Sequence, residues 1–461
     1  MSTSSSSKNE KSGTKAPLKK FTIGFETEFF IIDRDGRIAH AAEAIFEKAN
    51  ESEGQKTHAV TKECADNLLE VGSYPDIEGP NTMKSLLYGL KLLTYAAKEL
   101  GYGVLPLGTY PGKFTPSIRK EPRYKVQTAL FGAKRFEIAG RVAGYHCHYA
   151  LPWGVFDSKK LDLKRLSDSK NQEALVSAFN FLVALDPALS TFMQSSPFYQ
   201  GRYLAKDSRM LVYCGSEELG YDKGLYTSFP TFGSLPAYVH AGTDIIGQIE
   251  DRHALWMKNI EEAGVKTKPV YRSILDTNWA PVKVNAHGTF EQRGMDMNRL
   301  PILFSVSVLI QTLMQRIQDG EFKVVPHDSA KAEPFRIDEK AKVIYIAPDT
   351  HVRKVLQRSS TYEGLANDEI LFYCKRVLAL AKVLGGEAVL QLLDPLSQML
   401  AERTTQSDLI LAQAKALGYK DMKEPLPQAI ASEIALSHAK QMFENIVILE
   451  KMIETNAALS K

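Results

Sequence analysis

Residues 21–32, FTIGFETEFFII, constrain the fold more than any other segment of the chain. Their aromatic and β-branched content favours a strand, in which alternate side chains share one face. One face would be apolar and turned toward a core, with Phe21, Ile23, Phe25, Phe29 and Ile31 on it. Glu26 and Glu28 would point the other way, about 7 Å apart along the strand. Gly24 on their face leaves room for a ligand to approach.

This pair of glutamates has two interpretations. Two neighbouring carboxylates repel each other unless a cation lies between them, so the pair indicates a site for a hard metal ion. The alternative is the solvated polar face of an edge strand, because charged side chains are mostly exposed. The segment alone leaves both open.

A second acidic group lies in residues 61–75, TKECADNLLEVGSYP. If the segment is helical, Glu63, Asp66 and Glu70 share one face. If it turns to strand at Leu68, only Glu70 need point toward a site. Glu70 would lie beside a core, where a carboxylate needs a partner or a metal. A surface helix is the alternative interpretation.

The third pattern is a pair of histidines in residues 143–152, AGYHCHYALP. In a strand, His146 and His148 share a face, with Cys147 and Tyr149 opposite. Such a pair could bind zinc, but zinc sites usually need a third protein ligand. An ordinary histidine pair in the core or on the surface is equally compatible with the pattern.

Two further segments carry arginines beside polar residues. In residues 288–296, GTFEQRGMD, Glu291 and Arg293 would share a strand face. They could form an ordinary ion pair, or Glu291 could bind a metal while Arg293 binds a phosphate oxygen. In the loop predicted at 206–215, Arg209 is a candidate carboxylate clamp or a plain surface arginine.

Composition and absent motifs narrow the function. The net charge of +3 is too small to indicate a nucleic-acid partner, and no stretch is apolar enough to predict a membrane span. Four scattered cysteines and an N-terminus without a signal-type apolar run predict a cytoplasmic protein with reduced thiols. Phe114 follows Gly112-Lys113, so no P-loop occurs there, and GxSxG and HExxH are absent. An ATP-using enzyme of this sequence would hold phosphates through metals and arginines.

Taken together, these segments resemble the glutamate–cysteine ligases, within the glutamine-synthetase-like carboxylate–amine ligase superfamily. GFETEFFIID is similar to the family's first strand with its paired metal-binding glutamates, and TKECADNLLEV to its next acidic segment. AGYHCHYALP resembles the strand with a metal-site histidine. SSPFYQG followed by DSRM resembles the stretch that brings in a substrate-binding arginine, and GTFEQRGMDMN the late metal- and phosphate-binding strand. The order of the family is kept over residues 21–300, and the last third matches weakly.

The resemblance implies an α+β fold, with a glutamine-synthetase-like curved antiparallel sheet around the site, helices outside it and a helical C-terminal part. The expected organisation is a disordered tail at 1–18, a catalytic domain at 19–330 and a mostly helical region at 331–461 packed on that domain. Deleting residues 1–16 is expected to leave activity intact. The sequence does not indicate an oligomeric state.

The implied activity is the ATP-dependent joining of the γ-carboxyl of glutamate to the amine of cysteine, through a γ-glutamyl phosphate. This is the first step of glutathione-type thiol synthesis. The resemblance implies a metal site for Mg²⁺, or Mn²⁺, held by Glu26, Glu28, Glu63, Glu70, His146 and Glu291.

Other residues take implied roles in binding and phosphoryl transfer. Arg293, with Glu291 beside it, would stabilise the transferred phosphoryl group. Arg293 and Lys283 would contact the nucleotide, although relatives carry an arginine just before the GT of the late strand and Lys283 or Arg272 are the nearest candidates here. The substrate contacts would come from Arg209, Tyr145 and His148.

Three alternatives remain at this stage. The enzyme could join glutamate to another amine, it could be a non-catalytic metal- or nucleotide-binding relative, or it could be a zinc hydrolase built on His146 and His148.

Overall fold

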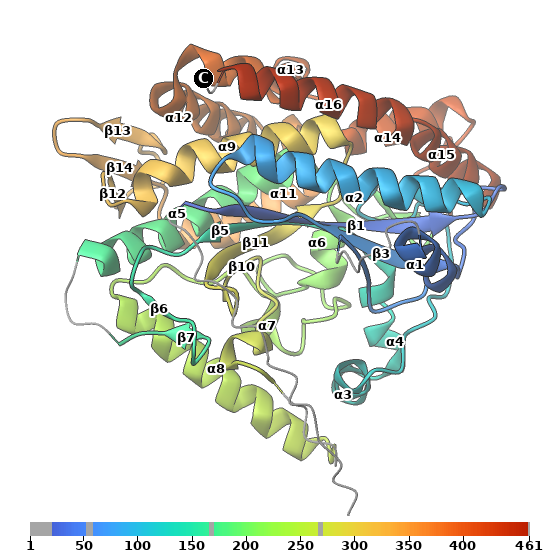
Figure 1. The fold of residues 1–461 in the computed structure, drawn as a ribbon, viewed down its shortest axis with the longest axis horizontal. Helices are drawn as coiled ribbons and strands as arrows, with labels where there is room; N and C mark the ends of the chain where they lie inside the picture. Colours follow the sequence, from blue (N-terminus) through green and yellow to red (C-terminus); the bar gives the residue numbers. More distant parts are fainter. Residues whose placement is uncertain (1–20, 52–58, 166–169, 266–270, 460–461) are drawn as a thin grey trace, which may run out of the picture.

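A computed structural model describes residues 21–51, 59–165, 170–265 and 271–459. Its centre is an antiparallel sheet in which six strands follow the order β10-β11-β5-β1-β3-β2, while β4 pairs with the end of β1 on the same side as β5 (Figure 1). The strands of this sheet are β1 (Ile23–Ile32), β2 (Val60–Lys62), β3 (Leu68–Gly72), β4 (Gly103–Leu105), β5 (Gly144–Ala150), β10 (Val282–Asn285) and β11 (Thr289–Asp296).

The strand β1 lies in the interior of this sheet, since it pairs with β3 on one side and with β5 and β4 on the other. Phe25, Phe29 and Ile31 on its apolar face are buried in the core, as predicted. The edge-strand interpretation of the two glutamates is therefore wrong.

Long helices cover one face of the sheet. The helices that pack directly on it are α2 (Gly79–Glu99), α5 (Lys170–Met193) and α9 (Leu300–Gln318). By length and composition α5 and α9 could cross a membrane, but 94% and 72% of their apolar windows are buried inside the protein, as in core helices. Figure 1 shows α2, α9, α12 and α16 above the sheet, with α6, α7 and α8 below it.

The helix α5 contains a proline, since it continues through Asp186-Pro187 to Met193. Proline normally breaks a helix interior because it lacks an N–H. Here the segment is buried on all sides, and its packing outweighs the lost hydrogen bond. Thr191 also donates a hydrogen bond to the Pro187 carbonyl, at 2.7 Å.

The C-terminal part is helical, as predicted. It consists of α12 (Asp368–Leu392), α13 (Asp394–Glu402), α14 (Gln406–Ala416), α15 (Gln428–Lys440) and α16 (Met442–Leu459). α12 is interrupted at Gly386, where φ is 74°. One hydrophobic core continues from the sheet into these helices, so the domain boundary near residue 330 stays a prediction. The predicted tail at 1–18 lies outside the described residues.

Residues 323–346 contain a separate small sheet, in which a parallel strand adds to an antiparallel pair. Its strands are β12 (Lys323–Pro326), β13 (Arg336–Asp338) and β14 (Val343–Ile346). The remaining strands are β6 (Phe156–Asp157), β7 (Asp162–Leu163), β8 (Phe198–Tyr199) and β9 (Arg202–Tyr203).

The remaining helices, most of them short apart from α8, complete the architecture. Those of the first half are α1 (Ala42–Glu51), α3 (Pro122–Phe131), α4 (Ala133–Phe136) and η1 (Ala139–Arg141). Those that follow are α6 (Ser208–Tyr213), α7 (Pro230–Gly233), α8 (Gly242–Glu262), η2 (Ile274–Thr277), α10 (Asp349–His351), the π-helical turn η3 (Val352–Leu356), α11 (Gln357–Glu363) and η4 (Gly364–Ala366).

Candidate metal and phosphate site

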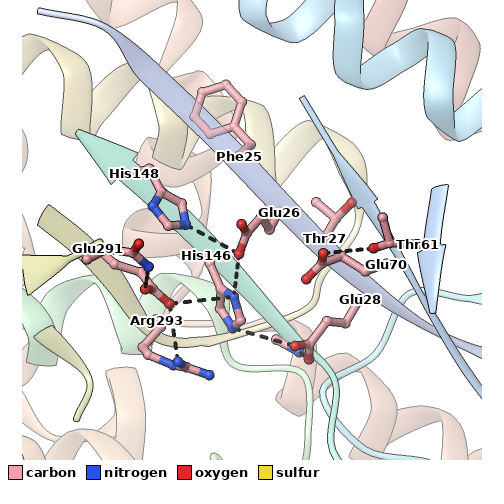
Figure 2. A network of polar contacts seen from close by, with 12 residues as sticks. Phe25, Glu26, Thr27, Glu28, Thr61, Glu70, His146, His148, Glu291 and Arg293 are labelled. Atoms are coloured by element: carbon pink, nitrogen blue, oxygen red, sulfur yellow. Dashed lines mark hydrogen bonds and ion pairs between the residues drawn. The ribbon is translucent and has the colours of Figure 1, made fainter. Parts of the chain in front are cut away.

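The sheet face opposite the long helices gathers the predicted carboxylates and imidazoles in rows across neighbouring strands. Glu26 lies opposite His146, and Glu28 lies opposite Glu70. Glu291 lies opposite His148 one row further along. Figure 2 shows these side chains pointing toward one another from β1, β3, β5 and β11. Register brings together residues that are more than 200 positions apart in the chain.

The two imidazoles lie between the carboxylates. His146 approaches Glu26 through Nδ1 at 3.2 Å and Glu28 through Nε2 at 3.7 Å. His148 Nε2 lies 3.3 Å from Glu26, and its Nδ1 lies 3.0 Å from the hydroxyl of Thr289. Burial opposes a charge on His148, but Glu26 outweighs it and raises the pKa of this imidazole.

These side chains form three overlapping sets of possible metal ligands, in each of which the ligand atoms lie within 4.8 Å of one another. The sets are Glu26, His148 and Glu291; Glu26, Glu70 and His146; and Glu28, Glu63 and Glu70. Because Glu26 and Glu70 are each shared, the sets form one continuous cluster. Carboxylate oxygens suit hard cations such as Mg²⁺, and the mixed sets also suit Mn²⁺.

The electrostatics of the acidic end fit a cation. Burial, with the charge of Glu28 next in importance, raises the pKa of Glu63 to about 7. Burial and then the charges of Glu26 and Glu63 raise the pKa of Glu70 well above its ordinary value. The charge of Arg123 offsets the rise at Glu63 only in part, so these carboxylates have too little countercharge among the described residues, and a divalent ion would supply it.

At the other end of the cluster, the negative charges of the carboxylates are already balanced by neighbouring cations. Burial opposes ionisation of Glu291, but Lys283 at 3.6 Å and Arg293 at 3.3 Å lower its pKa below the ordinary value. Burial likewise opposes ionisation of Glu26, yet the two histidines hold its pKa well below the ordinary value. The need for an added cation is thus greatest around Glu63 and Glu70.

The helical interpretation of residues 61–75 was wrong, because the segment forms β2, a turn and β3. Glu63 and Glu70 nevertheless converge on the cluster, with Glu70 accepting a hydrogen bond from Thr61 at 3.0 Å. Asp66 does not join them, since it pairs with Arg119 at 3.3 Å.

Arg209 lies in the short helix α6 and not in a loop, and its side chain is only 3% exposed, so the surface-arginine interpretation was wrong. Its guanidinium donates to the carbonyl of Arg293 at 3.3 Å. It also passes so close to Gly144 that a Cβ there would lie 2.2 Å from its Nη2. The absence of a side chain at Gly144 is therefore what lets Arg209 reach the site.

A small cavity lies between Arg209 and Arg293. The Nε atoms of both guanidinium groups are buried and have no hydrogen-bond partner. Tyr213 and Trp279 form part of the aromatic lining. Neither aromatic residue was predicted, although both lie in segments rich in aromatic residues. Two guanidinium groups beside one small cavity suit carboxylate or phosphate oxygens.

A second small cavity lies beside Lys283 at the β10 edge of the sheet. Apolar side chains such as Phe179 and Ile249 form its walls, and Arg252 and Asn278 supply polar groups. Arg252 was missed because a single arginine within a helical segment gives no signal in the sequence.

Tyr145 does not fit the predicted substrate contact. It faces the helices on the other side of the sheet, is fully buried and shares a hydrogen bond of 2.6 Å with Ser307. The alternation of β5 places it on the face opposite to His146 and His148, which lie one and three residues further along. Of the two candidates Arg272 and Lys283, Arg272 is exposed, whereas Lys283 is buried at the site and joins Arg293 there.

Comparison with known proteins gives a family match and fold matches. The family model described as "Glutamate-cysteine ligase family 2(GCS2)" matches residues 22–342. A bifunctional glutathione synthetase from Pasteurella multocida matches at a TM-score of 0.54 and 13% identity, over 92% of this chain and 53% of the synthetase. This chain therefore spans about half of that protein.

A second solved structure, glutamate–cysteine ligase from Francisella tularensis in complex with AMP, also matches at a TM-score of 0.54. The identity is 11%, and the match covers 96% of this chain and 97% of that ligase. No curated protein matches. At these identities the two structures show a shared fold, and they confirm the α+β architecture with its antiparallel sheet and C-terminal helices.

Proposed function

The chain belongs to glutamate-cysteine ligase family 2, and on this basis we propose that it is an ATP- and Mg²⁺-dependent ligase that joins glutamate to cysteine. The observation that carries the proposal is the geometry of the site: a continuous cluster of metal-ligand groups beside a cavity lined by Arg209 and Arg293. The product, γ-glutamylcysteine, is the first intermediate of glutathione-type thiol synthesis. The four free, buried cysteines are compatible with the cytoplasm as its location.

The reaction has to activate a carboxylate, which is a poor acyl donor. ATP would transfer its γ-phosphoryl group to the γ-carboxyl of glutamate, the amine of cysteine would attack the acyl phosphate, and inorganic phosphate would leave. Both steps bring several anions together. Bound Mg²⁺ would neutralise the phosphate charge and align the reacting groups.

The residues proposed to bind the phosphoryl group, glutamate and the metal lie at different ends of the cluster. Arg293 would bind the transferred phosphoryl group, because its guanidinium lies between the cluster and the cavity. Arg209 would bind a carboxylate of glutamate from the other side of that cavity. The metal would be held by Glu26, Glu28, Glu63, Glu70, His146 and Glu291. His148 belongs to one of the ligand sets, so it would act as a metal ligand and not as a substrate contact.

The second cavity is a candidate binding site for the base of the nucleotide. The related ligase from Francisella tularensis was solved with AMP. In this chain, Lys283 connects the phosphate end of the cluster with a cavity that has apolar walls and polar ends, which suits a flat heteroaromatic base. We therefore place the base beside Lys283 and Val284.

The proposal is tested by phosphate release from ATP with Mg²⁺ and glutamate, with and without cysteine, for wild type and Glu28→Gln. Cysteine-dependent release that the substitution abolishes would support it. Release that prefers another amine would keep the mechanism and change the acceptor. No release with any amine, together with no Mg²⁺-ATP binding in calorimetry, would refute the proposed function.

A further inference from the structure

The strand β11 is bulged where it carries Arg293. Its pairing with β5 shifts between Gln292 and Met295, so that residues 293 and 294 have no direct partner on β5. A bulge redirects side chains and is not held by the regular ladder alone. Here the backbone N–H of Arg293 donates to the Pro281 carbonyl at 2.8 Å. The other contacts that hold the bulge must come from the helices behind the sheet.

A buried carboxylate lies directly behind it. Asp186 on α5 is 0% exposed and accepts a hydrogen bond from the side chain of Gln292 at 2.7 Å. A Cβ at Gly294 would lie 2.7 Å from the same carboxylate, so Asp186 touches both sides of Arg293 along the strand. Its second oxygen accepts from Gln357 at 3.1 Å. The three side chains form one chain of hydrogen bonds from α11 to β11.

Gln357 is itself held rigidly, although it lies beyond the residues that the family model matches. It is the first residue of α11 and follows the π-helical turn η3, a rare element that is frequent at functional sites. Ser360 on the same helix donates to the Pro187 carbonyl at 3.1 Å and shares a hydrogen bond of 2.7 Å with Thr191. α11 is thus fastened to the turn of α5 that carries Asp186.

We propose that Gln357 is a positioning residue: acting through Asp186, it holds the bulge of β11 from which Arg293 reaches the site. Burial raises the pKa of Asp186 to about 7, and the two amide donors oppose that rise. Loss of the Gln357 amide would therefore weaken the acceptor on which Gln292 depends. The role assigned to Arg293 rests on the proposed function, whereas the mechanical link does not.

The first experiment measures this link without any assay of activity. Gln357→Met keeps the volume and removes the donor. Gln406→Met is the matched control, because Gln406 is also buried in the C-terminal helices, at 3% exposure against 5% for Gln357. Hydrogen exchange of residues 289–296 is expected to become roughly tenfold faster in Gln357→Met only, while exchange of residues 68–72 in β3 stays as in wild type.

Exchange in 289–296 that matches the control, or an equal rise in every strand, would overturn the proposal. If Gln357→Met does not fold, Gln357→Asn, which is shorter by one methylene and withdraws the amide from Asp186, is measured in its place. The hydrogen-exchange experiment tests the link between Gln357 and β11 even if the protein shows no ligase activity. Failure of this proposal can therefore be distinguished from failure of the proposed function.

The second experiment asks whether the link acts through Arg293. Gln357→Met is expected to lower kcat roughly tenfold to a hundredfold, with KM for glutamate nearly unchanged. In an Arg293→Lys background the same substitution is expected to have little further effect, because the side chain that the bulge aims is already altered. Fully additive losses would show that Gln357 acts only on overall stability, against the proposal.

Discussion

Substituting Glu63 by glutamine tests the charge balance of the cluster most directly. The substitution keeps the size of the side chain and removes one negative charge from the set formed with Glu28 and Glu70. The pKa of Glu63 rises from its ordinary value of 4.5 to about 7 in the folded protein. A carboxyl whose folded pKa is raised costs nothing below pH 4.5. Its cost grows as pH rises to 7 and stays constant above that pH.

The magnitude follows from that shift. At 1.36 kcal/mol per pKa unit, ionised Glu63 destabilises the metal-free protein by roughly 3 kcal/mol at pH 8. Because the side chain of Glu63 keeps some exposure, we expect about 2 kcal/mol. In EDTA at pH 8, Glu63→Gln should therefore unfold at a higher temperature than wild type, by a few degrees. At pH 5 the difference should nearly vanish.

Mg²⁺ is expected to reverse the order. A ligand present at about 100 times its Kd stabilises the protein by about 2.7 kcal/mol, so the wild type should gain more from Mg²⁺ than the variant, which lacks one ligand. Thermal unfolding followed by fluorescence or calorimetry, in EDTA and in Mg²⁺, measures both effects. Asp66→Asn is the matched control: it loses the ion pair with Arg119, should be less stable in both conditions and should keep the wild-type response to Mg²⁺.

Two results would refute this reasoning. If Glu63→Gln were less stable than wild type in EDTA at pH 8, the site would not be short of positive charge. If it kept the full response to Mg²⁺, Glu63 would not bind the metal.

Three further predictions concern other parts of the molecule. Glu291→Gln should lower the free energy of unfolding by about 3 kcal/mol even in EDTA, because it leaves two buried cations without their partner; an unchanged denaturation midpoint would contradict this. Gly144→Ala should displace Arg209 and raise KM for glutamate at least tenfold. Gly247→Ala is the control, because a Cβ there meets nothing within 4 Å among the described residues. Equal KM values for the two variants would show that Arg209 is not part of the substrate site. Burial lowers the pKa of His438 to about 4, so the free energy of unfolding should be highest above pH 6.5 and fall by roughly 3 kcal/mol as pH drops to 4. Urea titrations of His438→Leu should lack this loss. The same loss in the variant would point to another group.

The sequence alone determined the faces of single elements. Alternation placed Glu26 with Glu28, His146 with His148, and Glu291 with Arg293, each pair on one face of a strand, and the structure confirms these strands. This worked because the period of two in a strand is a local property that register cannot change.

The tertiary structure decided what those faces meet. The register of β1 with β3 and β5 brings Glu70 and His146 to the glutamates of β1, although nothing in residues 61–75 distinguished a strand from a helix. Only packing shows that Arg209 is buried at the site and that Tyr145 lies on the other side of the sheet.

The link from Gln357 through Asp186 to Gln292 joins segments that are far apart in the chain, and three isolated polar residues carry no periodic signal. Periodicity is set by neighbours along the chain and can be read from the sequence. Contacts across a sheet or between helices depend on how distant segments fold against one another, so only the folded structure assigns them.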